Sequence, residues 1–141
     1  MKGGGMVYHC RLEKTDSMVL VSFPDLPDIQ TYGETIDSAL LNAKEALNGC
    51  LASDVSRGLL PPDPVFHDGD SIPIEVAPHV LISIQLRKLR GEQSQTEIAS
   101  RLNVSYQSYQ TLENPVKCNP TIRNLERVAQ AMGKRLIIQI V

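Results

Sequence analysis

Short alternating runs of apolar and polar residues characterise the first part of the chain, and turn-forming residues separate them. Such alternation is typical of half-buried strands. The runs expected to form strands are residues 7–14, 18–23, 29–32 and 71–76. Thr15, Asp16 and Ser17 join the first two runs, which predicts a β-hairpin. Pro73 lies inside the last run, and because proline cannot donate to a strand ladder we expect an edge strand there.

A helical pattern lies between the third and fourth of these runs. Thr35 is suited to cap its N-terminus, and Gly58 is suited to end it. Apolar or small residues recur every three or four positions in Ile36, Ala39, Leu40, Ala43, Ala46, Leu47, Cys50 and Leu51. The order β-β-β-α-β predicts a small α+β module in which one helix covers one face of a sheet. We expect a second copy or a protein partner to cover what the helix leaves open.

From Pro78 onward the pattern changes to short helices, expected at residues 79–90, 95–102 and 106–113, with a last one opening at Pro120 or Thr121. In the first and last of them, the residues expected to face inward are Val80, Ile84, Leu89, Ile122, Leu125, Val128, Ala129 and Met132. The apolar residues 136–141 predict a final strand. We therefore expect an α+β module over residues 1–76 and an all-α module with a short C-terminal strand over residues 77–141.

Composition narrows the class of protein. The chain has 141 residues, 42% hydrophobic and 4% aromatic, which favours an aliphatic core in one ordinary or two small domains. Its apolar runs are too short to span a bilayer, and no apolar segment of signal-peptide length follows Met1–Gly5. The cysteines and histidines are scattered: Cys10, Cys50, Cys118, His9, His67 and His79. We expect reduced thiols in a cytoplasmic protein, with no metal and no cofactor.

Charge is distributed unevenly along the chain. Residues 1–75 hold five bases and twelve acids, a net charge of −7, whereas residues 76–141 hold nine bases and four acids, a net charge of +5. A basic half can bind phosphate backbones, and an acidic half would repel nucleic acid and attract a basic protein. A chance imbalance on solvated faces is the alternative.

The most informative segment is residues 94–113, which predicts two short helices around a three-residue turn. Ser94 and Glu97 form the sequence pattern of a capping box, and the small Ala99 suits a close helix crossing. With Tyr109 and Leu112 facing the core, the outer face of the second helix carries Tyr106, Gln107, Gln110 and Thr111. These polar, neutral side chains suit a helix that reads base edges in the major groove, where Gln pairs bidentately with adenine. A purely structural helical bundle is the alternative.

This segment resembles the phage-repressor-like (Cro/C1 type) helix-turn-helix, in Ser-Gln-x-Glu-Ile-Ala at residues 94–99 and Leu-Glu-Asn at residues 112–114. The resemblance covers about residues 78–134. It implies phosphate contacts by Gln95 and Ser105, base reading by Tyr106, Gln107 and Thr111, and Gln110 on the backbone side. Members of that family often have Glu-x-Gly after the recognition helix, whereas this chain has Glu-Asn-Pro at residues 113–115. Asn114 is expected to allow the exit by taking a left-handed conformation. Such proteins read two half-sites, so we expect a homodimer or a higher homo-oligomer, with residues 136–141 of two copies paired.

The first half resembles a different family. Val-Ser-Phe-Pro-Asp-Leu-Pro-Asp at residues 21–28, Thr-Tyr-Gly-Glu-Thr at 31–35, Ala-Lys-Glu-Ala-Leu at 43–47 and Leu-Pro-Pro-Asp-Pro at 60–64 resemble the HicB antitoxins, although Asp28 stands where glycine is common. The resemblance implies a partial RNase H-like module without activity. That module would bind a HicA toxin, a small basic ribonuclease that cleaves mRNA, and cover its active site, while the second module would repress the chain's own operon at its operator DNA.

Two other functions compete with this interpretation. One is a free-standing helix-turn-helix regulator whose first module senses a small molecule. The other is a nuclease, whose metal chemistry needs converging carboxylates. Asp25 and Asp28 lie in a proline-rich loop, where we expect solvated acids. The sequence also contains no phosphate loop and no nucleophile elbow, so we expect no enzymatic activity and no catalytic residue.

Overall fold

A four-stranded antiparallel sheet forms one end of the molecule in the computed structural model, which describes residues 5–141; residues 1–4 of the Met1–Gly5 segment lie outside it. Its strands are β1 (Val7–Lys14), β2 (Val19–Ser22), β3 (Gln30–Gly33) and β4 (Ile72–Glu75), in the order β3-β2-β1-β4. The four predicted strands are confirmed, with ends shifted by about one residue. Pro73 lies in the edge strand β4, as predicted, opposite His9 of β1.

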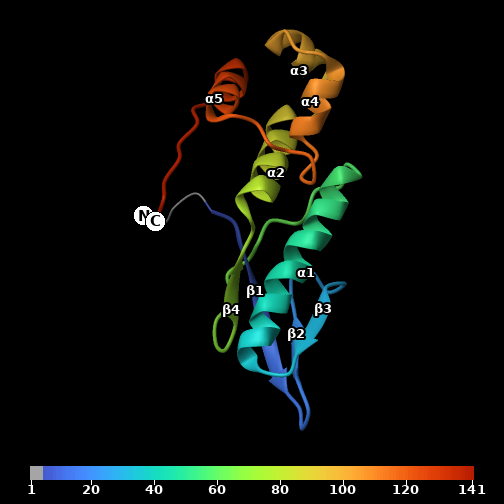
Figure 1. The fold of residues 1–141 in the computed structure, drawn as a ribbon, viewed down its shortest axis with the longest axis vertical. Coiled ribbons are helices and arrows are strands. Elements are labelled where there is room, and N and C mark those ends of the chain that lie inside the picture. Colours follow the sequence, from blue (N-terminus) through green and yellow to red (C-terminus); the bar gives the residue numbers. More distant parts are fainter. Residues whose placement is uncertain (1–4) are drawn as a thin grey trace.

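Helix α1 (Ile36–Ser56) lies along one face of this sheet (Figure 1). Thr35 caps it as predicted, because its hydroxyl accepts the backbone N–H of Ser38 at 3.1 Å. The buried helix residues follow a strict four-residue spacing: Ala39, Ala43, Leu47, Leu51 and Val55. Leu40 and Ala46 are partly buried against the same core, whereas Ile36 and Cys50, which were expected on this face, are exposed because they lie farther from the buried row.

The loop between α1 and β4 folds back over the Asp25 carboxylate. Oδ2 of Asp25 accepts the backbone N–H of Val65 at 3.0 Å, and Oδ1 of Asp25 lies 2.8 Å from Nε2 of His67. The hydrogen bond from Val65 holds the pKa of Asp25 below its usual range. The prediction of a solvated acid is therefore wrong for Asp25, whose partners lie about 40 residues away in sequence; Asp28 is exposed, as expected.

Helix α2 (Pro78–Arg90) connects the sheet layer to the remaining helices. Its Val80 and Ile84 belong to the core between α1 and the sheet, whereas Leu86 belongs to a second apolar cluster. Helices α3 (Gln95–Leu102), α4 (Tyr106–Leu112) and α5 (Ile122–Ala131) contribute the rest of that cluster. Its other buried members are Ile98, Ala99, Leu102, Tyr109 and Val128. The Ser83 hydroxyl of α2 donates to the Leu112 carbonyl at 3.0 Å, which ties α2 to the end of α4.

Three expectations for the second half are wrong. Leu89 and Ile122 were expected inward but are 38% and 65% exposed. Helix α2 contacts the cluster through Leu86, and α5 with its C-cap does so through Val128 and the partly buried Met132, both of which were expected inward. Residues 136–141 form no strand and run away from the helices (Figure 1). A strand needs a partner ladder, and no strand in residues 5–141 pairs with this segment.

The helices of residues 5–141 include none with the length and apolar character needed to cross a membrane.

Candidate nucleic-acid interface

Helices α3 and α4 are joined by a sharp turn at residues 103–105. Ser94 and Glu97 form the predicted capping box at the start of α3, since the Ser94 hydroxyl accepts the Glu97 N–H at 3.0 Å. Asn103 ends α3 in the left-handed conformation, at φ 58° and ψ 43°. Asn114 was expected to adopt that conformation and does not, so this expectation is wrong. Its side-chain oxygen instead accepts the N–H of Val116 at 3.0 Å, which stabilises the exit from α4 with an ordinary backbone.

The outer side of α4 presents the polar side chains that the sequence predicts there. Tyr106 is 42% exposed, and Gln107 and Gln110 are also exposed, whereas Tyr109 is fully buried as expected. The Gln110 amide donates to the Tyr106 hydroxyl at 3.4 Å. Thr111 is half-buried, and its hydroxyl donates to the Gln107 carbonyl at 2.9 Å. Tyr106, Gln107 and Gln110 therefore share one exposed face, with Thr111 at its margin.

Ser105 is exposed and acts as the N-terminal cap of α4. Its hydroxyl accepts the Ser108 N–H at 3.1 Å and donates to the Ser108 hydroxyl oxygen at 2.9 Å. The capping role thus accounts for the local geometry of Ser105, and the residue stays on the surface beside Tyr106 and Gln107.

A buried ion pair fixes how α4 is placed on α2. Arg90 Nε lies 2.7 Å from Glu113 Oε2, and Arg90 Nη2 donates to Glu113 Oε1 at 3.0 Å. The side chains are 14% and 5% exposed, respectively. Gln95 at the start of α3 donates to the same carboxylate oxygen at 3.1 Å. One carboxylate therefore connects the end of α2, the start of α3 and the end of α4.

The electrostatics keep this pair charged. Burial by itself would raise the pKa of Glu113, but the hydrogen bonds from Arg90 and Gln95 hold that pKa below its usual range. The hydrogen bond to Glu113 raises the pKa of Arg90. A bidentate, charge-assisted arrangement of this kind adds geometric specificity as well as energy.

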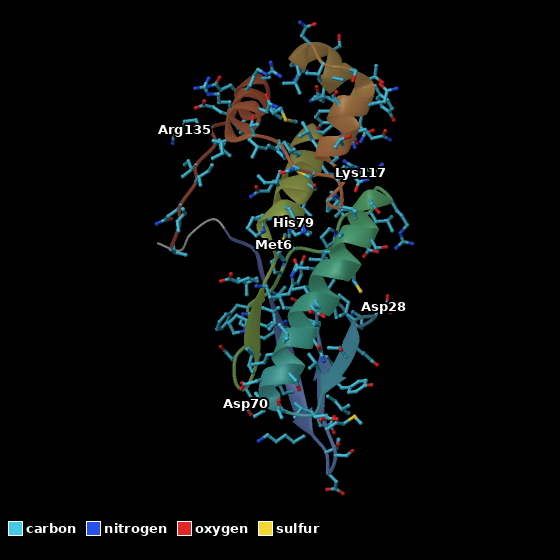
Figure 2. The ribbon with its side chains drawn as sticks, in the orientation of Figure 1. Met6, Asp28, Asp70, His79, Lys117 and Arg135 are labelled. Atoms are coloured by element: carbon cyan, nitrogen blue, oxygen red, sulfur yellow. The ribbon has the colours of Figure 1, made fainter. Side chains whose placement is uncertain are left out.

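A polar pocket of about 150 Å³ lies beside the pair. It is lined by Gln95, Gln110 and Thr111, and by Arg90, Glu113, Asn114 and Lys117, with Val55, Ser56 and Gly58 contributed by the end of α1. Figure 2 shows Lys117 near that end of α1. The predicted site residues thus fall into two groups: Gln95, Gln110 and Thr111 at the pocket, and Ser105, Tyr106 and Gln107 toward the start of α4.

Sequence reasoning missed Arg90, Glu113 and Lys117 as parts of this region. Arg90 and Glu113 are 23 residues apart, so no local periodicity connects them. The Leu-Glu-Asn pattern at residues 112–114 was the available signal for Glu113, and a basic helix end was the signal for Arg90. For Lys117, which follows the proline turn after α4, the sequence carries no comparable signal.

Within residues 5–141, no three His, Cys, Asp or Glu side chains are grouped so that they could hold a metal ion. The side chains on the exposed face of α4 are hydrogen-bonding groups, and their amides and hydroxyls can both donate and accept. This chemistry suits recognition of a polar surface such as the edge of a base pair.

Comparison with known proteins places the chain in a family. No protein-family model matches it. Over 122 residues it is 30% identical to Antitoxin HicB 1 of Photorhabdus laumondii subsp. laumondii, and the similarity covers 85% of this chain and 77% of that protein. A match of that extent cannot fit within residues 1–76, so it includes part of the second half as well. The resemblance stated from residues 21–64 is thereby confirmed: the chain belongs to the HicB antitoxin family.

Proposed function

We propose that this chain is the antitoxin of a type II toxin-antitoxin system that inhibits a HicA-type mRNA-cleaving toxin and represses its own operon. The name of the relative, an antitoxin, supports the first part. The observation that carries the second is the exposed polar face of α4, held by the buried Arg90–Glu113 pair. A protein acting on mRNA cleavage and on operator DNA belongs in the cytoplasm.

The toxin-binding part is assigned to residues 1–76. Their net negative charge suits a small basic ribonuclease, because complementary charge steers association and fixes register. The element order β1-β2-β3-α1-β4 supports the proposal of a partial RNase H-like module without activity of its own. The two separate apolar clusters support a division into modules near residue 76, although α2 contributes to both clusters. Calorimetric titration of the full chain with the HicA-type protein of the same genome tests this part: we expect a saturable complex, and no heat of binding would contradict it.

The DNA-binding part is assigned to α3 and α4 acting as a helix-turn-helix. In this proposal Gln95 and Ser105 contact phosphates, Tyr106, Gln107 and Thr111 read bases, and Gln110 lies on the backbone side. The basic second half supports it, because cations that neutralise phosphates release counterions.

Replacing Gln107 with Ala is expected to weaken operator binding by about 1–3 kcal/mol and to relax its sequence preference, because a base-edge contact is lost. Fluorescence anisotropy with the fragment upstream of the operon, against a scrambled duplex, measures both quantities. Gln130→Ala, at an exposed position of α5, is the matched control and should bind as wild type. Equal operator affinity of the Gln107 variant and the wild type would remove Gln107 from the reading face.

We also propose a homodimer, formed by pairing of residues 136–141 between two copies. The segment is apolar and largely exposed: Ile137, Ile138, Ile140 and Val141 are 76%, 55%, 96% and 105% exposed. An exposed apolar segment with strand propensity is a ready template for pairing with another chain.

Deleting residues 136–141 is expected to convert the dimer to a monomer and to weaken operator binding, since two half-sites would no longer be read together. Sedimentation velocity at matched concentrations measures the change in mass. Val116→Ser, which removes a 78% exposed apolar side chain elsewhere in the second half, is the control and should leave the mass unchanged. An unaltered dimer after the deletion would rule out this segment as the dimer contact.

A further inference from the structure

The sheet has an open face opposite α1, and it carries an apolar groove. Val7 and His9 of β1 alternate with the buried Tyr8 and Cys10, so they point away from α1. A groove of about 490 Å³ lies on that side, beside the edge strand β4. Its lining includes Val7, His9, Pro64, Val65, Phe66 and Pro73. Neither the resemblances nor the comparison assigns a role to this groove.

Phe66 and Val65 are unusually exposed for large apolar residues. They are 70% and 55% exposed, although the loop that carries them is held in place on both sides. Asp25 binds this loop through the Val65 N–H and the His67 ring, as described above. The Tyr8 hydroxyl donates to the Pro62 carbonyl. These contacts present the two apolar side chains in a fixed position instead of on a free loop.

The Phe66 ring is itself positioned from within the groove. It meets the His9 ring edge-on, with centroids 5.2 Å apart and planes at 79°. An aromatic side chain that is exposed yet already ordered loses little conformational entropy when a partner covers it. Aromatic residues of this kind are enriched among the residues that dominate binding energy at interfaces.

Three acids adjoin residues that line the groove, and we call these acids its rim. Glu75 is paired with Val7 across the β1–β4 ladder, and Asp68 lies two residues after Phe66. Asp70 precedes Ser71, whose hydroxyl oxygen lies 3.0 Å from Nδ1 of His9. These three acids are exposed, and none of them forms a salt bridge within residues 5–141. The same face of β1 continues to one exposed cation, Arg11. The partner that suits this surface is therefore a basic protein with an apolar side chain at its centre.

We propose that this groove is the site at which the chain holds its toxin, with Phe66 and Val65 as the apolar anchor and Asp68, Asp70 and Glu75 as the rim that faces the toxin's cations. The inference rests on the proposed antitoxin function and adds the surface that performs it. A second copy of this chain is a poorer occupant, because it would bring an identical acidic rim against this one, and like charges in register oppose association.

The test is calorimetric titration of the full chain and its variants with the HicA-type ribonuclease of the same genome, made inactive by substitution. Phe66→Asp is expected to weaken binding by about 30-fold or more, as for an aromatic anchor. Leu41→Asp is the matched control, because Leu41 is 61% exposed on the outer side of α1, and it should bind within about 3-fold of wild type. Asp68→Lys combined with Asp70→Lys should slow association, and this effect should shrink as salt is added.

The outcomes distinguish the antitoxin function from the assignment of the groove. If wild type binds the toxin and Phe66→Asp and Val65→Asp bind equally well, the groove is not the toxin site while the antitoxin function stands. If wild type does not bind, the function and the groove assignment both fail. If Phe66→Asp leaves toxin binding intact but turns a dimer into a monomer by sedimentation, a second copy is the occupant and the proposal is overturned. Circular dichroism of each variant verifies the fold, which these exposed substitutions should leave unchanged.

Discussion

Replacing Arg90 with Ala is expected to lower the free energy of unfolding by about 3–5 kcal/mol at neutral pH. The substitution leaves the Glu113 carboxylate, only 5% exposed, without its bidentate partner. It also releases the contact that holds α4 on α2, so the operator binding proposed above should fall together with stability. Urea denaturation followed by far-ultraviolet circular dichroism measures the change.

Lys88→Ala is the matched control for the Arg90 variant. Its ion pair with Asp63 is 2.7 Å long, but the two side chains are 38% and 84% exposed. Exposed pairs contribute at most about 1 kcal/mol, because water and salt screen them. Equal losses in the two variants would show that the Arg90–Glu113 pair has no special structural role.

The loss of stability caused by Arg90→Ala is also expected to depend on pH. The pKa of Glu113 is lowered in the folded chain, so its pairing stabilises the protein above the ordinary glutamate pKa of about 4.3, and the stabilisation is lost as pH falls through the lowered value. Without Arg90, burial acts to raise that pKa instead. The difference in unfolding free energy between wild type and Arg90→Ala should therefore be largest at neutral pH. It should shrink as pH falls, first through the raised pKa of Glu113 in the variant and finally through the lowered pKa in wild type. Other carboxylates, including Asp25, titrate alike in the two proteins, so their contributions to stability cancel in this difference.

Replacing Gly33 with Ala is expected to cost about 3 kcal/mol, the second large effect. Gly33 ends β3 and is buried against the start of α1. A Cβ there would lie 2.7 Å from the Cα of Ala39 and closer still to its backbone nitrogen. Because the obstacle is backbone, relief requires a shift of the first turn of α1, and the Ala39 row would then lose its contact with the sheet.

Gly49→Ala is the matched substitution inside α1. A Cβ at Gly49 meets no atom within 4 Å, so the change should stabilise the helix by about 0.5–1 kcal/mol. The two alanine variants should thus move the urea midpoint in opposite directions. A Gly33 variant as stable as wild type would show that the junction between β3 and α1 is not tightly packed.

Local patterns predicted most of the secondary structure. The alternation in β1 and the four-residue row of α1 are set by which side chains face a single packed surface, and that information lies within a few residues. The capping residues Thr35, Ser94 and Thr121 mark helix starts because their side chains satisfy free N–H groups of the first turn. Such signals need no knowledge of the rest of the chain.

Contacts between distant segments were not predictable in this way. Asp25 and His67 are 42 residues apart, so the loop acid could not be distinguished from a solvated one. Leu89 and Ile122 are apolar residues at helical spacing, yet each falls beside the face that packs. Residues 136–141 have the composition of a strand, but strand formation depends on a partner that residues 5–141 do not supply.

In the candidate site, too, the parts set by local spacing were predictable and the parts set by distant contacts were not. The exposed face with Tyr106, Gln107 and Gln110 follows from helical spacing once Tyr109 is assigned to the core. The position of Gln95 on the Glu113 carboxylate depends on how three helices meet, which the sequence does not encode locally. In the sequence, Gln95 and Glu113 are connected only because residues 94–99 and 112–114 both resemble known repressors.

Inhibition of RNA cleavage is the activity that the proposed antitoxin function requires. The HicA-type ribonuclease of the same genome is mixed with an mRNA and increasing amounts of the full chain, and the intact RNA is quantified. We expect cleavage to stop near an equimolar amount of the chain, and we expect the chain alone to leave the RNA intact with or without Mg²⁺. Undiminished cleavage at a large molar excess of the chain would contradict it.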